Sequence, residues 1–320
     1  MASETKRMTD NGTATYTNPD DYQAAIERAN IKLTITAGAD FEARLTWLKL
    51  HNLRVFRGYE KFPIIAYISF PSARASVSFP TAVSASIWGG FELRVGDIVF
   101  HSSGERTHRW TSGESQWGLV SLPAEELAAC AKALTGLKVT LPAFGRVLRP
   151  SRSAAARLFD LHSKACRLAE TRLELIAHPE VVRAIEQELL HALVNCLTAD
   201  DAAVNVETRR HHADIMIRFE DALTAYTGRQ FPMAELCAAI GVPERTLRMC
   251  CAEFLGVSPT RYLLLRRLNR ARSVLLRADP ATASVAEIAR SFQFSELGRF
   301  AMTYRTVFGE VPSATLRRTP

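Results

Sequence analysis

Two stretches in the last third of the chain place arginines on one side of a short helix that follows a turn. In residues 233–259, helical spacing puts an apolar stripe on one side and Arg245 and Arg248 on the other. In residues 284–312 the corresponding outward residue is Arg299. Arginine donates hydrogen bonds to phosphate oxygens and to the major-groove edge of guanine. These residues therefore predict binding of nucleic acid.

The two stretches are copies of one pattern, with one residue inserted. Each reads as an apolar helix, a tight turn and a second helix that ends at a Gly and a Pro. The first turn carries Gly241, which tolerates a positive φ. The second turn has Gln293 in that place, so a residue with a Cβ must adopt a positive φ at some cost, or the turn takes another shape. The pattern predicts two helix-turn-helix motifs.

The segment between the copies predicts one helix from Thr260 to Arg277, rich in arginine. A helix of that length spans about 27 Å. One turn of B-DNA is about 34 Å. The helix could therefore hold two recognition helices near successive major grooves on one face of a duplex.

The excess positive charge of the chain lies in the same region. The whole chain has a formal net charge of +7, and residues 209–320 hold 17 arginines, no lysine and 10 acids. The remaining residues are neutral overall. A basic third joined to a neutral remainder is typical of a polyanion-binding module attached to another domain. A solvated charged surface is the alternative interpretation.

At these residues the chain resembles the AraC/XylS family of bacterial transcriptional regulators. The matching motifs are AELCAAIGVPERTLRMCCAEFLGVSPTRYLLLRRLNRAR and SVAEIARSFQFSELGRFAMTYRTVFGEVPSATLR, which cover about residues 209–318. The resemblance implies a DNA-binding domain of seven helices and an N-terminal domain that senses an effector or dimerises. Combining the family positions with the outward helix faces, we expect DNA contacts from Arg245, Thr246, Arg248, Met249, Leu297, Gly298, Arg299, Met302, Thr303 and Arg305.

The second recognition helix departs from the family pattern. Leu297, Gly298 and Met302 stand where polar readers are often found. We therefore expect direct base readout mainly from the first helix, with phosphate or thymine-methyl contacts from the second.

The N-terminal part of the chain predicts an α+β fold. Residues 31 to about 125 contain short Val-, Ile- and Phe-rich runs bounded by turn residues, which predict a cupin-like β-barrel. Within them, Gly96-Asp97 predicts a hairpin turn. Trailing amphipathic helices are predicted over residues 123–136, 151–170 and 178–197. We expect a disordered arm at 1–30, a sensor or dimerisation domain at 31–200, a linker at 201–208 and a DNA-binding domain at 209–320.

Other residues leave alternatives open. His101 and His108, with Glu105 between them, suggest a metal site, and a cupin-like metal enzyme with an appended DNA-binding domain is the alternative function. The simpler interpretation is that these histidines are exposed or form ordinary hydrogen bonds within the protein. We expect no metal, no cofactor and no catalysis. The indole rings that could line an effector pocket or pack in the core are those of Trp88, Trp110 and Trp117.

We therefore expect a cytoplasmic, nucleoid-associated regulator controlled by a small molecule. Its expected partners are promoter DNA, RNA polymerase, an effector of unknown identity and a second copy bound through residues 154–197. No apolar run approaches the roughly 18–20 residues of a membrane span. A structural nucleoid protein without sequence preference is the remaining alternative, since its binding would be almost all counterion release.

Overall fold

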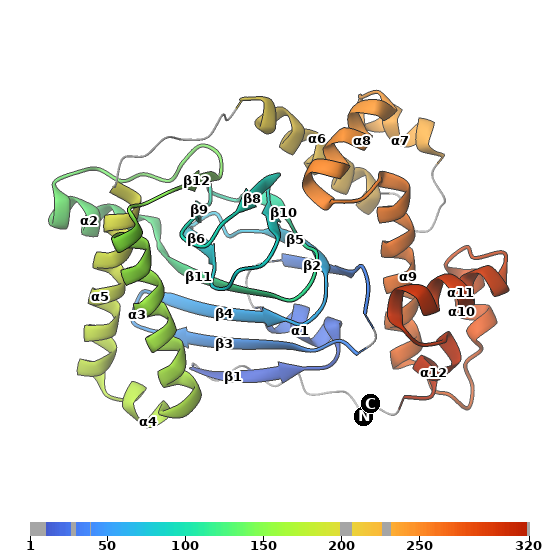
Figure 1. Cartoon of the computed structure of the whole chain (residues 1–320), viewed down its shortest axis with the longest axis horizontal. Helices are drawn as coiled ribbons and strands as arrows, with labels where there is room; N and C mark the ends of the chain where they lie inside the picture. The colour runs from blue at the N-terminus through green and yellow to red at the C-terminus, as the bar shows by residue number, and fades with distance from the viewer. Residues whose placement is uncertain (1–10, 27–29, 39, 199–206, 226–231, 319–320) are drawn as a thin grey trace.

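The structure is a computed structural model that combines two β-sheets with helices on opposite sides (Figure 1). It describes residues 11–26, 30–38, 40–198, 207–225 and 232–318. Within these ranges, no helix is long and apolar enough to cross a bilayer.

Both sheets are antiparallel, and apolar side chains from the two fill the space between them. The seven-stranded sheet has the order β1 (Asn11–Tyr16), β3 (Ala43–Lys49), β4 (Arg54–Glu60), β11 (Ser115–Pro123), β6 (Arg74–Pro80), β9 (Ile98–Phe100), β12 (Arg146–Leu148). The five-stranded sheet has the order β2 (Asn30–Ile35), β5 (Ile64–Ser69), β10 (Arg106–Thr111), β7 (Ser86–Trp88), β8 (Phe91–Leu93).

The cupin-like barrel is not confirmed. Among the strands that the structure describes, β1 and β12 end one sheet and β2 and β8 end the other, with no ladder joining those ends. Strand β6 is buried along nearly its whole length because the second sheet covers one face and helices cover the other. Two facing sheets with a helical cover therefore bury the apolar strands without closure.

Three helices predicted to trail the strands are confirmed with small shifts in their ends. They are α2 (Ala124–Thr135), α3 (Arg152–Thr171) and α5 (Pro179–Thr198), with the short α4 (Leu173–Ile176) between the last two. Their buried apolar residues, among them Leu158, Leu189 and Leu193, form one core with the seven-stranded sheet. The wide apolar stripe of α5 is therefore buried within the chain itself.

The predicted disordered arm is wrong for the described part of residues 1–30. Strand β1 pairs with β3, and helix α1 (Pro19–Ala25) follows it. The Asn18 side chain caps α1 and Pro19 begins it, a helix start signal within a polar segment. Tyr22 of α1 is fully buried in one apolar cluster with Leu45 of β3 and Trp117 of β11, which explains why this polar segment folds onto the sheets. Residues 1–10 lie outside the described chain.

The predicted hairpin at Gly96-Asp97 is also wrong. The turn itself forms, because Asp97 N–H donates to the Arg94 carbonyl at 3.0 Å and Gly96 has a φ of 108°. However, β8 before the turn belongs to the five-stranded sheet, whereas β9 after it belongs to the seven-stranded sheet. The turn therefore carries the chain from one sheet to the other.

The C-terminal helices are α6 (Glu207–Ala225), α7 (Met233–Ile240), α8 (Glu244–Leu255), α9 (Pro259–Arg277), α10 (Val285–Ser291), α11 (Leu297–Phe308) and α12 (Pro312–Leu316). Both predicted helix-turn-helix motifs and the long helix between them are confirmed. Of the predicted linker, 201–206 lies outside the described residues, and α6 includes the rest. These helices lie on the side of the sheets opposite α3 and α5 (Figure 1).

Candidate nucleic-acid interface

The first motif consists of α7, a left-handed turn and α8. Gly241 has a φ of 75°, and its N–H donates to the Cys237 carbonyl at 2.9 Å. On α8 the predicted inward stripe is buried: Leu247, Cys251 and Leu255 are all fully enclosed. The opposite side of the helix is therefore left for solvent or a ligand.

The second motif forms the same turn without glycine. Gln293 has a φ of 62° and is the one non-glycine residue with a positive φ in the described ranges. Its N–H donates to the Arg290 carbonyl at 2.8 Å, so the turn is closed as in the first motif. The second recognition helix, α11, buries an aromatic stripe of Phe300, Tyr304 and Phe308. The first of the two predicted options for this turn is thus confirmed.

Every residue expected to contact DNA lies on α8 or α11 outside these buried stripes. Thr246, Leu297 and Thr303 are half-buried, and the others are exposed. Met249 and Met302 occupy equivalent positions of the two motifs and are 52% and 70% exposed. Large exposed apolar side chains at matched positions are typical of a contact surface. Their contacts with DNA stay a prediction.

The arginines on these faces are available for anions. Arg248 forms an ion pair with Glu244 at 2.5 Å one turn away, an exposed pair that contributes little to stability. Within the described residues, no ion pair to an acidic side chain is found for Arg245, Arg299 or Arg305. A phosphate or a guanine edge could bind here without displacing a strong partner.

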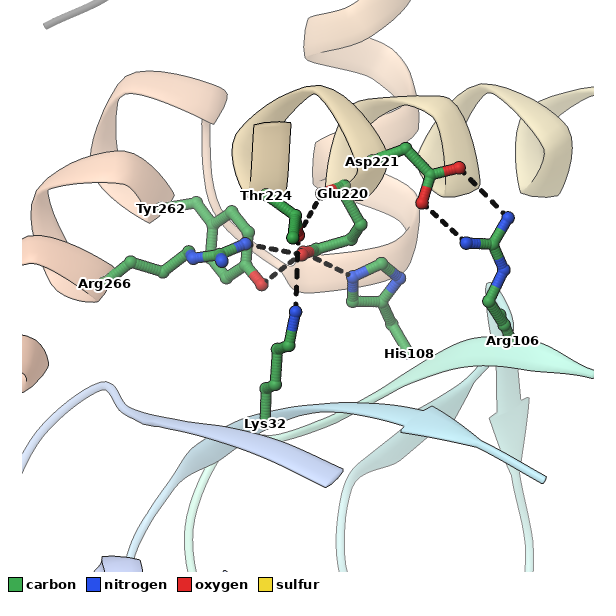
Figure 2. A network of polar contacts seen from close by, with 8 residues as sticks. All are labelled: Lys32, Arg106, His108, Glu220, Asp221, Thr224, Tyr262 and Arg266. Carbon is green, nitrogen blue, oxygen red and sulfur yellow. Dashed lines mark hydrogen bonds and ion pairs between the residues drawn. The ribbon is translucent and has the colours of Figure 1, made fainter. Parts of the chain in front are cut away.

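A buried polar cluster joins the first motif to the sheets (Figure 2). Its centre is Glu220 on α6, which accepts hydrogen bonds from Tyr262 at 2.6 Å, from His108 of β10 at 3.1 Å, and from Arg266. Burial alone would raise the pKa of Glu220, but the hydrogen bond from His108 and the charge of Arg266 outweigh it and lower the pKa to about 2. Glu220 is therefore held as a carboxylate between the two parts of the chain.

Two contacts flank this cluster on α6. Arg106 of β10 binds both carboxylate oxygens of Asp221, at 2.6 and 3.0 Å. Lys32 of β2 donates to the Thr224 hydroxyl at 3.3 Å. Figure 2 shows these pairs on either side of Glu220, all reaching upward from the strands to the helices.

Helix α9 is attached along the edge strand β2. The side chain of Asn269 accepts from the Ile35 N–H and donates to the Ile35 carbonyl, both at 2.9 Å. The Asn269 amide thus takes the place of a further strand on this edge. Farther along, Arg277 of α9 pairs with Asp20 at 2.7 Å. Both motifs are therefore joined, through α6 and α9, to the same sheet domain.

The space between the sheets is small. A cavity of about 30 Å³ lies among apolar side chains from both sheets, with Trp88 and Trp117 in its wall. At its polar end Glu60 binds Arg109 at 2.8 Å and the Trp117 indole at 2.7 Å. This volume holds about one water. Trp110 is elsewhere, against Gly256 at the end of α8, where an added Cβ would lie 2.5 Å from its ring.

A larger space lies between the sheets and α6. It measures about 240 Å³, and its wall includes Trp88, His101 and two stacked pairs. In these pairs Arg209 lies over Phe91 at 4.1 Å and Arg210 lies over Phe144 at 3.7 Å. The wall of this space mixes aromatic and aliphatic side chains with charged and hydroxyl groups. Small-molecule sites are often found at domain junctions of this kind.

The histidines of the metal-enzyme alternative have separate partners. His101 contacts the Ser78 hydroxyl at 2.6 Å and Glu105 at 3.2 Å, whereas His108 faces Glu220. The described residues contain no group of three or more His, Cys, Asp or Glu that could hold a metal ion. The two histidines therefore act in different polar networks.

The helices of the proposed dimer surface present charged residues outward. On α3 and α5, Arg157 pairs with Glu188 at 2.8 Å and Lys164 pairs with Asp160 at 2.7 Å, all exposed. Because their apolar residues face the sheet, self-association through residues 154–197 would use a polar face. It stays a prediction.

Comparison with known proteins agrees with this C-terminal architecture. The family described as "Helix-turn-helix domain" matches residues 236–318. The "Probable thc operon regulatory protein" of Rhodococcus erythropolis is 34% identical over 146 residues, which are 46% of this chain and 44% of that protein. The "XylDLEGF operon transcriptional activator" of Pseudomonas putida is 34% identical over 90 residues, 28% of each chain. The chain therefore spans less than half the length of these two relatives.

A solved structure, that of the AraC-like transcriptional activator CuxR, covers 82% of this chain and 96% of its own at 16% identity, with a TM-score of 0.43. The family match over residues 236–318, by contrast, lies within the helices α7 to α12 that carry the two motifs. Residues 236–318 are a helix-turn-helix domain of the AraC/XylS type.

Proposed function

We propose that this protein is a sequence-specific DNA-binding regulator of transcription whose DNA binding is controlled by a small-molecule effector. The observation that carries the proposal is the pair of exposed faces on α8 and α11. Each lies opposite a buried stripe, and one rigid helix joins the motifs. Helix α9, about 28 Å long, holds the recognition helices α8 and α11 at a separation that fits two blocks of one DNA site.

Control by an effector is supported by the junction between the sheets and α6. A ligand in the space beside Arg209 and Arg210 would touch both the sheets and the first helix of the DNA-binding domain. Glu220 and Asp221 on the same helix are bound to β10. A ligand that prefers one placement of α6 would therefore shift the placement of the first motif.

Activation of transcription, through contact with RNA polymerase at promoter DNA, is the proposed outcome, because relatives of this domain are named as activators. A cytoplasmic position on the nucleoid follows from this function. Dimerisation through residues 154–197 belongs to the same proposal, with the polar outer faces of α3 and α5 as the contact.

The test is recovery and sequencing of genomic fragments bound by the full chain at physiological salt. The proposal predicts enrichment of one motif with two blocks about a helical turn apart. Uniform recovery of all fragments would instead indicate a structural nucleoid protein. Repeating the recovery with cell extract metabolites added, and with those metabolites removed, tests whether a small molecule changes the enrichment.

A further inference from the structure

A basic groove separates α9 from the second motif. It measures about 550 Å³ and runs between α9, the turn over residues 291–296 and the start of α11. Its wall holds four arginines and a single acid, Glu296, which is exposed. Figure 1 shows α10 and α11 beside α9, on the side away from the sheets. The arginines of the groove are Arg266, Arg267, Arg270 and Arg299.

Three of these arginines lie on α9, but only Arg266 forms an ion pair with a carboxylate of the described residues. Arg266 is bound to the buried Glu220. Arg267 lies over the ring of Phe294 at 4.2 Å, and Arg270 lies over the ring of Phe292 at 5.6 Å. The structure gives neither of the latter two an ion pair with a described residue, and Arg267 Nε is buried without a hydrogen-bond partner.

Stacking on phenylalanine prepares these guanidinium groups for an anion. The ring face holds the planar group in place and leaves its N–H edge free, so little side-chain freedom is lost when an acceptor binds. These two guanidinium groups have N–H donors that form no ion pair with a described carboxylate. They therefore favour a ligand with several anionic oxygens.

The groove is continuous with the face expected to contact DNA. Arg299 and Thr303 of α11 belong both to its wall and to the set of candidate contacts. The first turn of α11, a helix of twelve residues, has no side-chain cap, so its unpaired backbone N–H groups add positive potential at the same end.

We propose that Arg267 and Arg270 bind phosphates of the DNA backbone in the stretch between the two recognition helices. This inference rests on the proposed function. When the two helices occupy successive major grooves, α9 faces the intervening backbone, which offers phosphate oxygens and little sequence information. The groove therefore contributes affinity and sets the position of the protein on the duplex, while α8 and α11 read bases.

The experiment measures the affinity of the full chain for a recovered site and for random duplex over a series of salt concentrations. The variants are Arg270→Ala, which alters an exposed residue, and Arg267→Gln. Each is expected to weaken binding to both duplexes by the same factor and to reduce the slope of log K against log salt by about 1. Arg270→Lys keeps the charge and is expected to keep the slope.

The control removes the same charge far from the groove. Lys138→Ala alters an exposed residue beyond the end of α2, outside the proposed dimer surface, and is expected to leave the slope unchanged. Thermal unfolding of each variant shows whether the fold survives. If Arg267→Gln does not fold, the salt slope of Arg270→Ala alone tests whether the groove binds phosphate.

Three results would overturn the proposal. An unchanged slope in Arg270→Ala would mean that no phosphate is bound there. A loss confined to the recovered site would assign the arginines to base or minor-groove readout, and an equal loss in the control would reduce the effect to net charge. If the unaltered chain bound no DNA, the proposed function would fall with it, whereas failure of the groove alone leaves that binding intact.

Discussion

The two helix-turn-helix motifs share one architecture but differ in what they expose and in how they are held. The first has a glycine turn, exposes Arg245 and Arg248, and ends with Gly256 against Trp110 of the sheet domain. The second has a strained glutamine turn, exposes Met302, and packs an aromatic stripe. The difference suggests that the first motif reads bases and receives the signal of the sheet domain, whereas the second contributes mainly apolar and backbone contacts.

The largest expected effect comes from breaking the attachment of the first motif. Glu220→Ala leaves Arg266 in a half-buried position without its acid, and such a loss costs about 3–5 kcal/mol. The free energy of unfolding of the full chain, measured in denaturant, checks this value. The double variant Glu220→Ala with Arg266→Ala is the matched control and should recover part of the loss. A loss below about 1 kcal/mol in the single variant would contradict the role given to the cluster.

The same carboxylate predicts a dependence on pH. Its folded pKa of about 2 lies below the ordinary value of 4.5 for this side chain, so its contribution to stability is present above pH 4.5 and is lost as pH falls toward 2. The difference corresponds to about 3 kcal/mol. Between these pH values, the unaltered chain should lose more stability than Glu220→Gln. Parallel curves for the two proteins would show that Glu220 is not held as a carboxylate.

A smaller effect is expected from the exposed arginines of α8. Arg245→Ala should cost about 1–3 kcal/mol on a recovered site and much less on random duplex, because a base contact is lost. Equal weakening on both duplexes would leave only a phosphate contact. Met302→Ala at the second motif is the comparison, with a loss below about 1 kcal/mol expected when a thymine methyl is its partner.

The turns offer a reciprocal test of the comparison. Gln293→Gly should stabilise the second motif by about 1 kcal/mol, and Gly241→Gln should destabilise the first by about the same amount, because a positive φ disfavours a residue with a Cβ. Thermal unfolding of the two variants measures both changes. Changes of the same sign would show that the two turns are not equivalent.

The helical domain could be predicted from the sequence because its information is local. Apolar spacing and turn residues such as Gly241 fix each helix and its buried face within a few residues of chain. The conformation of Gln293 was predicted as one of two options for the same reason, since the alignment of the copies placed it opposite a glycine.

The sheet domain was predicted less well because its structure depends on distant partners. The Gly96 turn forms as expected, yet the two strands beside it join different sheets. Nothing local marks Tyr22 as a residue that will be buried against the sheets. The Glu220 cluster joins residues more than 100 positions apart, and only Tyr262 and Arg266 show a helical spacing that places them together. The clearest missed local signal was the capping sequence at Asn18 and Pro19.

Two motifs held on α9 are proposed to read two blocks of one DNA site. This proposal is tested most directly by inserting base pairs between the blocks of a recovered site and measuring the affinity of the full chain. An insertion of about 5 base pairs turns the second block to the opposite face of the duplex. We expect the affinity then to fall to that of a site with a single block. Unchanged affinity would contradict the proposal, because the two motifs would not be acting through one rigid helix.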